Sequence, residues 1–460
     1  MVRGLAAARL FGHFFRDPIG AARRNYELRG PFVAVEVPLG SRNKRKLIVV
    51  AAGPAFNEAV LSDPATWRHG SATPGGSRNS PARRASRGIL RLSGSEHEHA
   101  RRLLLPPLRR KSIDAQGVRM AELAEESVAS WPVNEPIDLV LRTNHLYRAL
   151  GIGILFGDER RLGYPTVELV DHGVGYNWSL GVAAFPFDLP GTPYARMQRG
   201  AAALERKIIE WAGQVRGRLD PGNLLSIMAN SPDHEGKPAS DALIVGQLPS
   251  LLAAVSETGG NVLIWTLVLL DQHPRIARDL LDELQGRLKG APPTLERIAD
   301  LPLLDAVVKE SMRIMPPVPQ QFRVATRDTT LSGFPVRRGT RVVLSGFLTN
   351  RMPDLYPEGD RFRPERWAKL APSPYEFSAF GAGPRGCPGF WFGETAVKVA
   401  LAAVLTRFRV ALAPGTRIDY KLGIAMGPRR PIPAMLHRQD GAFAAAPIRG
   451  AFRNLVRLPH

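Results

Sequence analysis

The sequence of 460 residues contains only one cysteine, Cys387, and no apolar run long enough to cross a membrane. A single cysteine cannot form an internal disulfide bond, which excludes a disulfide-stabilised secreted scaffold. A membrane-spanning helix needs about 20 consecutive apolar residues. The N-terminal residues also lack the uninterrupted apolar stretch of a signal peptide. We therefore predict a cytoplasmic protein without a membrane span.

Acidic residues are scarce relative to basic ones: 42 Asp and Glu stand against 62 Lys and Arg, which gives a formal net charge of +20. The composition is otherwise that of a globular protein, with 44% hydrophobic residues, and this excludes a disordered chain. The basic residues are scattered, without zinc-finger spacing or lysine runs, so we predict no nucleic-acid partner. Local basic clusters suit a solvated surface or the docking of an acidic protein.

Helical and strand-type sequences are segregated along the chain. Strand-type sequence occupies residues 33–37, 46–50, 321–328, 330–336 and 340–346. A long loop is expected over 64–93, and helical patterns fill 96–290 and 295–316. This order predicts an α+β fold, mainly α with small β-sheets, in one large domain. The segment from Leu243 to Leu270 is apolar on all sides, which indicates a helix buried in the protein centre.

The cysteine lies in a glycine-rich segment, Phe380-Gly-Ala-Gly-Pro-Arg-Gly-Cys387-Pro-Gly389, directly before a helical sequence. The free N–H groups at a helix N-terminus lower the pKa of a nearby thiol and stabilise the thiolate. The glycines let the backbone approach a flat ligand closely, and Arg385 offers a positive charge to an anionic group. At every position of the pattern F-G-x-G-x-R-x-C-x-G the segment resembles the haem-binding loop of the cytochrome P-450 family.

This resemblance implies the cytochrome P-450 fold, with the haem between the long central helix and the cysteine loop. It implies that Cys387 is the axial iron ligand of heme b (iron protoporphyrin IX), and that Phe380, Arg385 and Gly389 bind the cofactor. The chemistry implied is that of a monooxygenase, which inserts one atom of O2 into its substrate.

Other motifs follow the order of the same family. Glu310-Ser-Met-Arg313 resembles the family's E-x-x-R helix, and Arg366 resembles the arginine that completes its structural Glu–Arg–Arg cluster. His97 and Arg101 share one helix face, and with Arg323 they resemble donors to a haem propionate.

The central helix carries Ala254-Val-Ser-Glu257-Thr258, which resembles the family's A-G-x-(D/E)-T segment. Oxygen activation consumes two protons, and an alcohol beside a carboxylate can deliver them. The resemblance therefore implies catalytic roles for Thr258 and Glu257. Val255 stands where the family usually has glycine, and we expect it to narrow the space for oxygen and to slow or redirect catalysis.

The substrate pocket is predicted by matching family regions, and its lining is mostly apolar. The predicted residues are Trp67, Ile89, Leu90, Phe185, Phe187, Leu251, Ala254, Val255, Val318, Phe322, Ile424 and Met426. An apolar lining predicts a lipophilic substrate: a terpenoid, steroid, retinoid or fatty acid. The segment from Phe185 to Tyr194 resembles the retinoid- and steroid-oxidising branch of the family.

The electrons must come from outside, since no flavin or iron–sulfur segment is present. We expect an acidic ferredoxin or flavodoxin with its reductase, which draws on NAD(P)H. Residues 1–29 are predicted to form a basic amphipathic segment, 30–438 the catalytic domain, and 439–460 a basic tail of unknown role. A weak membrane-surface contact through the N-terminal segment stays open.

Two alternatives remain open for the function. The first is a haem-thiolate enzyme that uses peroxide or isomerises its substrate, and the second is a haem- or ligand-binding protein without catalysis. The Glu257–Thr258 pair argues against the first, and Val255 keeps it open.

Overall fold

The computed structural model describes residues 2, 12–13, 17–37, 46–70, 77, 79–157, 163–170, 182, 187–423 and 425–459. Its contacts divide the chain into two compact units. The first unit comprises Met1–Ser71, Lys309–Cys387 and Leu455–Arg457, and the second comprises Ala72–Val308, Pro388–Asn454 and Leu458–His460. The first unit contains most of the predicted strands and the second most of the predicted helices.

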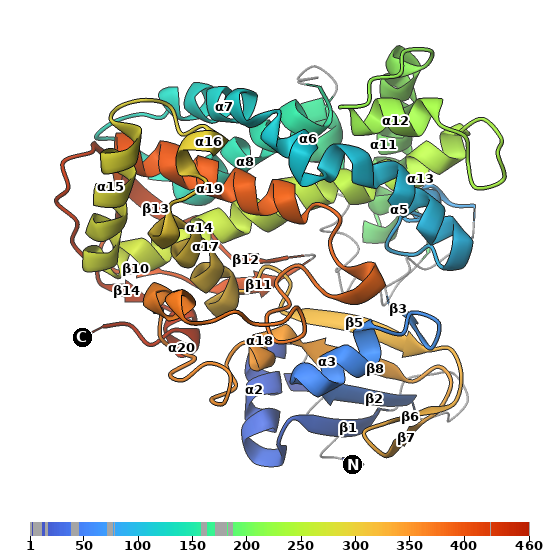
Figure 1. Ribbon diagram of the computed structural model, residues 1–460. Coiled ribbons are helices and arrows are strands. Elements are labelled where there is room, and N and C mark those ends of the chain that lie inside the picture. Colours follow the sequence, from blue (N-terminus) through green and yellow to red (C-terminus); the bar gives the residue numbers. More distant parts are fainter. Residues whose placement is uncertain are drawn as a thin grey trace. The chain divides into compact units, whose positions relative to one another are not determined.

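A five-stranded sheet organises the first unit, in the order β1-β2-β8-β5-β3. Its strands are β1 (Phe32–Val37), β2 (Lys46–Ala51), β8 (Arg341–Ser345), β5 (Gln320–Ala325) and β3 (Trp67–His69). Strands β1 and β2 correspond to the strand-type segments predicted at residues 33–37 and 46–50, and they pair antiparallel. Helix α3 (Pro54–Leu61) packs Val60 and Leu61 against the sheet residues Val49 and Val342, and Figure 1 shows it lying against the strands.

Short elements complete the first unit around this sheet. They are α2 (Pro18–Arg29), the hairpin of β6 (Thr329–Leu331) and β7 (Phe334–Val336), α18 (Gly346–Thr349), and the 3-10 turns η2 (Pro364–Ala368) and η3 (Gly383–Arg385). Helix α2 forms the last part of the predicted N-terminal segment, residues 1–29. The carboxylate of Asp17 caps this helix by accepting a hydrogen bond from the N–H of Gly20. Helix α17 (Pro302–Ile314) runs into this unit and ends before Pro316, which stops the helix.

Helices dominate the second unit. They are α4 (Pro81–Ala85), α5 (Gly94–Leu108), α6 (Arg110–Asp114), α7 (Gly117–Ala129), α8 (Leu139–Leu155), α11 (Pro193–Val215), α12 (Leu224–Asn230), α13 (Asp241–Ala253), α14 (Gly259–Asp271), α15 (Pro274–Leu288), α16 (Leu295–Ile298) and α19 (Phe390–Arg407). The core lies where α7, α8, α14 and α19 pack on one another, as Figure 1 shows. The sequence predicted one helix over 295–316, whereas α16 and α17 are separate because Pro302 begins a new helix.

Three small sheets accompany these helices. Strand β13 (Pro433–Arg438) lies between β4 (Pro136–Asp138) and β9 (Phe408–Leu412). Strand β10 (Thr416–Arg417) pairs with β14 (Ile448–Arg449), and β11 (Tyr420–Leu422) pairs with β12 (Met426–Pro428). The segment 64–93, predicted as a loop, contains β3 and the short helix α4 among its described residues. The predicted fold of helices with small sheets is confirmed.

The long central helix is interrupted at one place. Helices α13 and α14 are joined by a single π-helical turn, η1 (Ala254–Thr258), which contains the predicted oxygen-activation motif. By length and composition Asp241–Asp271 is the one described helix that meets the criteria for a membrane span, and 83% of its apolar window is buried. Every residue of α14 is buried, so this is the core helix that the sequence predicts.

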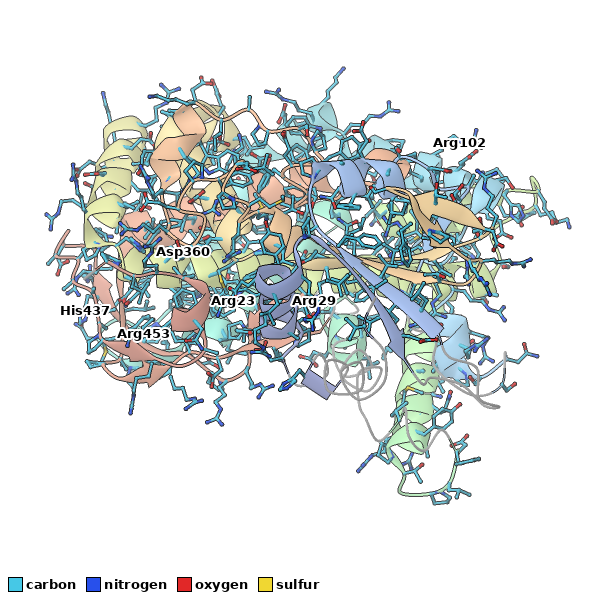
Figure 2. The ribbon with its side chains drawn as sticks, turned by 90° about the horizontal axis from the view of Figure 1, so that it is seen from below. Arg23, Arg29, Arg102, Asp360, His437 and Arg453 are labelled. Carbon is cyan, nitrogen blue, oxygen red and sulfur yellow. The ribbon has the colours of Figure 1, made fainter. Side chains whose placement is uncertain are left out.

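The predicted C-terminal tail packs against the core of the second unit. The ring of Phe452, on α20 (Phe452–Leu455), stacks on Trp265 of α14 with ring centroids 5.8 Å apart. The side chain of Gln272 donates to the carbonyl of Ala446 at 2.8 Å. Arg453, labelled in Figure 2, is exposed on the same short helix. The tail therefore covers the C-terminal half of the central helix.

Candidate active site

The cysteine loop is shaped by its backbone. The N–H of Cys387 donates to the carbonyl of Phe380 at 2.7 Å, and the N–H of Gly386 donates to Gly383 at 2.9 Å. Gly383 has φ +66°, and a Cβ there would lie 2.2 Å from the carbonyl oxygen of Leu61, so only glycine fits. These contacts hold Cys387 in a fixed turn with its side chain exposed.

Arg323 and Arg385, the two arginines expected to bind haem, lie in the same unit as this loop. Arg323, on β5, is only 3% exposed and donates to the carbonyl of Phe322 at 3.0 Å. Its pKa is lowered to about 10, first because burial removes the guanidinium from water and second because Arg385 adds a positive charge. Among the residues that the structure describes, Arg323 forms no ion pair with a carboxylate. A buried cation beside a second cation is an environment that favours an anionic group.

The predicted Glu310–Arg313–Arg366 cluster is formed in the first unit. The side chains of Glu310 and Arg313 are fully buried and joined by two hydrogen bonds of 2.8 Å. Arg366 donates to Glu310 at 3.0 Å. Arg313 also donates to the carbonyls of Asn350 and Gly359, which ties α17 to the segment that follows α18. The cluster therefore stabilises the fold around the cysteine loop's own unit.

Sequence reasoning missed two further donors to Glu310. The indole N–H of Trp367 donates to Glu310 at 3.0 Å, and the backbone N–H of Arg363 donates to it at 2.8 Å. Trp367 directly follows Arg366 in the sequence, and an indole beside a predicted cluster residue was the available signal. With these donors every lone pair of the buried carboxylate faces a hydrogen-bond partner or a charge, which buried ionised groups require.

The second unit contains the other predicted site residues. His97 and Arg101 lie one turn apart on α5, with His97 only 7% exposed. Glu257 and Thr258 are half-buried in η1. The hydroxyl of Thr258 donates to the carbonyl of Ala254 at 2.8 Å, inside the π-helical turn. Such turns widen the helix locally and are frequent at functional sites.

A family comparison decides what this arrangement is. The model of the cytochrome P450 family matches residues 39–432, which is most of the chain. The chain belongs to the cytochrome P450 family. The predicted family and the predicted enzyme class, a cytochrome P450 monooxygenase, are thereby confirmed.

Curated relatives of this P450 include bacterial oxygenases. Cyclooctat-9-en-7-ol 5-monooxygenase of Streptomyces melanosporofaciens is 29% identical over 71% of this chain and 73% of its own length. Pentalenene oxygenase of Streptomyces avermitilis is 33% identical over 45% of this chain and 47% of its own length. Among solved structures, the retinoic-acid-bound cyanobacterial CYP120A1 superposes with a TM-score of 0.78 at 22% identity, covering 93% of this chain and 95% of that one. This structural likeness shows the fold.

The residues of the first unit fit the haem that the P450 family implies. Cys387 supplies an exposed sulfur on a glycine-rich turn. Gly381, in the same turn, has φ +70°, and a Cβ there would lie 3.7 Å from the Gln321 side chain, so the turn lies beside β5. The buried guanidinium of Arg323, near the positive charge of Arg385, suits the binding of a negatively charged carboxylate group. A thiolate donor next to cationic side chains is the donor set that a haem with propionates requires.

Val255 packs toward a neighbouring helix of this P450. A Cβ placed on Gly151 of α8 would lie 2.7 Å from the Cβ of Val255, so a glycine on α8 makes room for the valine on the central helix. Val255 is only 6% exposed, whereas its neighbour Ala254 is exposed. The volume of Val255 is therefore taken up at the contact with α8. The expectation that it slows or redirects catalysis stays a prediction.

The contact between α8 and the central helix alternates large and small residues. A Cβ on Gly259 would lie 2.0 Å from the ring of Tyr147, which is the reverse of the Val255–Gly151 arrangement. Because each small residue meets a large one, the two helices fit in only one register. This register fixes the rotation of η1.

We expect Gly151→Ala to destabilise the protein by about 1–3 kcal/mol, since the added methyl group overpacks the contact with Val255. In the double variant Gly151→Ala/Val255→Gly part of this loss should disappear, because the two valine side-chain atoms nearest the new methyl group, Cβ at 2.7 Å and Cγ2 at 3.2 Å, are gone. Thermal unfolding of the wild type, the two single variants and the double variant measures the coupling energy between residues 151 and 255. Gly200→Ala on α11, where a Cβ meets open space, is the matched control and should not lose stability. Strictly additive losses at residues 151 and 255 would contradict the packing argument.

The predicted pocket residues are distributed over both units. Trp67, Ile89, Leu251, Val255 and Met426 are buried, Val318 and Phe322 are half-buried, and Leu90, Phe187 and Ala254 are exposed. Phe185 and Ile424 lie outside the described residues. Met426 sits in the core of its unit, where its carbonyl accepts from the indole N–H of Trp265 at 2.9 Å.

Proposed function

We propose that this P450 inserts one oxygen atom from O2 into a lipophilic terpenoid, with Cys387 as the iron ligand. The observation that carries the proposal is the glycine-rich turn that presents the only cysteine of the chain. The names of two bacterial relatives, a cyclooctat-9-en-7-ol monooxygenase and a pentalenene oxygenase, support a terpenoid. A retinoid is the second candidate, because the structural neighbour holds retinoic acid.

The proposed roles of the side chains follow from their chemistry. When bound, haem supplies the iron at which O2 is reduced and oxygen is transferred. Cys387 holds the iron through its thiolate. The proposed donors to the propionates are Arg323, Arg385, His97 and Arg101, by charge-assisted hydrogen bonds.

Thr258 and Glu257 are proposed to deliver the protons. The Thr258 hydroxyl already donates to a backbone carbonyl in the π-helical turn, so it is oriented by the helix that carries it. Glu257, next to it and half-buried, is able to exchange protons with solvent. This acid–alcohol pair favours a reaction that uses O2 and a reductant over one that uses peroxide.

We propose an acidic ferredoxin or flavodoxin, with an NAD(P)H-dependent reductase, as the electron donor. Arg102, labelled in Figure 2, is exposed, as are Arg109, Arg110 and Lys111. The guanidinium of Arg110 lies 5.3 Å from the ring centre of Trp391, which is 40% exposed and lies four residues after Cys387 in the chain. A basic surface with an exposed aromatic ring suits an acidic partner.

We propose a cytoplasmic location and a catalytic domain at residues 30–438, between the N-terminal segment 1–29 and the tail 439–460. The burial of the only described helix with the length and composition of a membrane span indicates a core helix, and the single cysteine of the sequence suits a reducing compartment.

The proposed function is tested by turnover of the haem-loaded protein with terpenoids that shift its ferric Soret band. With an acidic ferredoxin, its reductase and NADPH, we expect a product that carries one atom from isotopically labelled O2. Thr258→Ala should keep the haem but consume reductant with little product, because the proton donor is lost. Raising the salt concentration should slow the reduction of the protein by the ferredoxin, because salt screens the attraction between the basic surface and the acidic partner. Turnover by peroxide alone, or product without the label, would favour the alternative haem-thiolate chemistry.

A further inference from the structure

Gln247 is a buried amide that has no partner among the described residues. It lies on α13 and is 4% exposed, and within the part of the chain that the structure describes neither its side-chain oxygen nor its nitrogen has a hydrogen-bond partner. Gln272, another buried glutamine, uses its nitrogen to donate to Asp271 and to Ala446. Buried amides that lack both partners are rare, because the lost hydrogen bonds to water are not replaced. The structure therefore contains an unused donor and an unused acceptor at one point of α13.

Gln247 lies on the same face of the central helix as Ala254, the first residue of the oxygen-activation motif. At 3.6 residues per turn, Gln247, Leu251 and Ala254 lie on one face of the central helix. Ala254 is exposed, and its carbonyl accepts the hydroxyl of Thr258. Gln247 precedes Ala254 by seven residues, which places the two about 10 Å apart along the helix axis.

The segment that contains Ile89 and Leu90 borders this part of α13. A Cβ on Gly88 would lie 2.3 Å from the hydroxyl of Ser250 and 2.8 Å from the carbonyl of Gly246. Leu251, the next residue toward Ala254 on the shared face, is apolar and 8% exposed. Gln247 is therefore a polar residue on the helix face that it shares with two apolar predicted pocket residues, Leu251 and Ala254.

We propose that Gln247 is a specificity-determining residue, whose amide hydrogen-bonds a hydroxyl group of the substrate. The inference rests on the proposed function, and it deepens it. A hydroxyl both donates and accepts, so it is able to use the amide oxygen and the amide nitrogen, whereas a carboxylate only accepts. The substrate is then a terpenoid alcohol whose hydroxyl is bound on α13, about two helical turns before Ala254. The reaction that supplies it must already have introduced this oxygen.

The test uses matched pairs of a terpenoid alcohol and its deoxy analogue, titrated by the shift of the ferric Soret band. The wild-type protein should bind the alcohol about tenfold more tightly, the effect of one neutral hydrogen bond. Gln247→Leu should abolish this preference and bind the deoxy analogue at least as well, and the product of the alcohol should become a mixture of regioisomers. An unchanged preference in Gln247→Leu would overturn the proposal.

A second measurement separates this inference from the proposed function. If no terpenoid shifts the Soret band of wild type or of Gln247→Leu, the proposed substrate class fails. Thermal unfolding then still shows whether the Gln247 amide lacks hydrogen-bond partners. Removing an unpaired buried amide should raise the melting temperature of Gln247→Leu, whereas Gln272→Leu, which removes paired hydrogen bonds, should lower it. A Gln247→Leu variant that melts as far below wild type as Gln272→Leu would show that the amide is satisfied within the protein, which overturns the inference.

Discussion

The Cys387→Ala variant should fold, and its reduced complex with carbon monoxide should lack the strongly red-shifted Soret band of thiolate-ligated haem. The protein has no other cysteine, so no second thiolate is available to the iron. The side chain of Cys387 is exposed, and the turn is held by backbone hydrogen bonds that alanine preserves. The red-shifted band should therefore disappear because the sulfur ligand is missing, and not because the protein unfolds. Turnover should fall to background, since the ligand that favours O–O cleavage is gone.

Spectra of wild type, Cys387→Ala and Cys387→Ser measure this effect, with circular dichroism as the control for folding. Serine keeps the size of the side chain and removes the sulfur, so both variants should lose the band together. A red-shifted band that persists in either variant would refute ligation by Cys387. A wild-type protein that binds haem but never shows the band would refute it too, and would favour a haem protein without monooxygenase chemistry.

Replacing Glu310 by glutamine should reduce the free energy of unfolding by about 3–5 kcal/mol, the cost of breaking a buried ion pair from one side. The reason is the environment of the carboxylate. It is fully buried and accepts from Arg313, Arg366 and Trp367. Glutamine removes the negative charge and turns one acceptor into a donor that faces these donors. Urea unfolding of the variant gives the magnitude.

The matched control is Glu365→Gln. Glu365 pairs with Arg363 at 2.8 Å, but its side chain is 63% exposed, so its loss should change stability by less than about 1 kcal/mol. Equal losses in the two variants would contradict the role assigned to burial.

The same variant has a predicted pH dependence. Burial alone would raise the pKa of Glu310, but hydrogen bonds and the positive charges of Arg313 and Arg366 outweigh it, so the pKa is lowered. A carboxylate with a lowered pKa contributes stability above the pKa of the unfolded chain, and loses it as the pH falls through the folded value. The stability difference between wild type and Glu310→Gln should therefore shrink in acid, and a constant difference would contradict the shift.

Local sequence was sufficient for the motifs and for some of the elements, but it merged α16 with α17 and predicted a loop where β3 and α4 lie. The strands at residues 32–37 and 46–51, the buried central helix and the turn before Cys387 all depend on side-chain periodicity and on glycine within a short window. The pair Glu310–Arg313 was predictable for the same reason, since residues three apart on a helix face one another. The retained family pattern then carried the prediction of the haem thiolate.

Tertiary structure alone decided what lies opposite these segments. Gly383 is required because the carbonyl of Leu61 passes beside it, and Val255 is accommodated because α8 has glycine at residue 151. The tail, whose role the sequence left open, docks through Phe452 on Trp265. Each of these contacts joins residues far apart in the chain, so neither periodicity nor spacing contains it. Only the folded chain decides which volumes and which hydrogen-bonding groups meet, and this is why Gln247 becomes visible as an unpaired amide only in the structure.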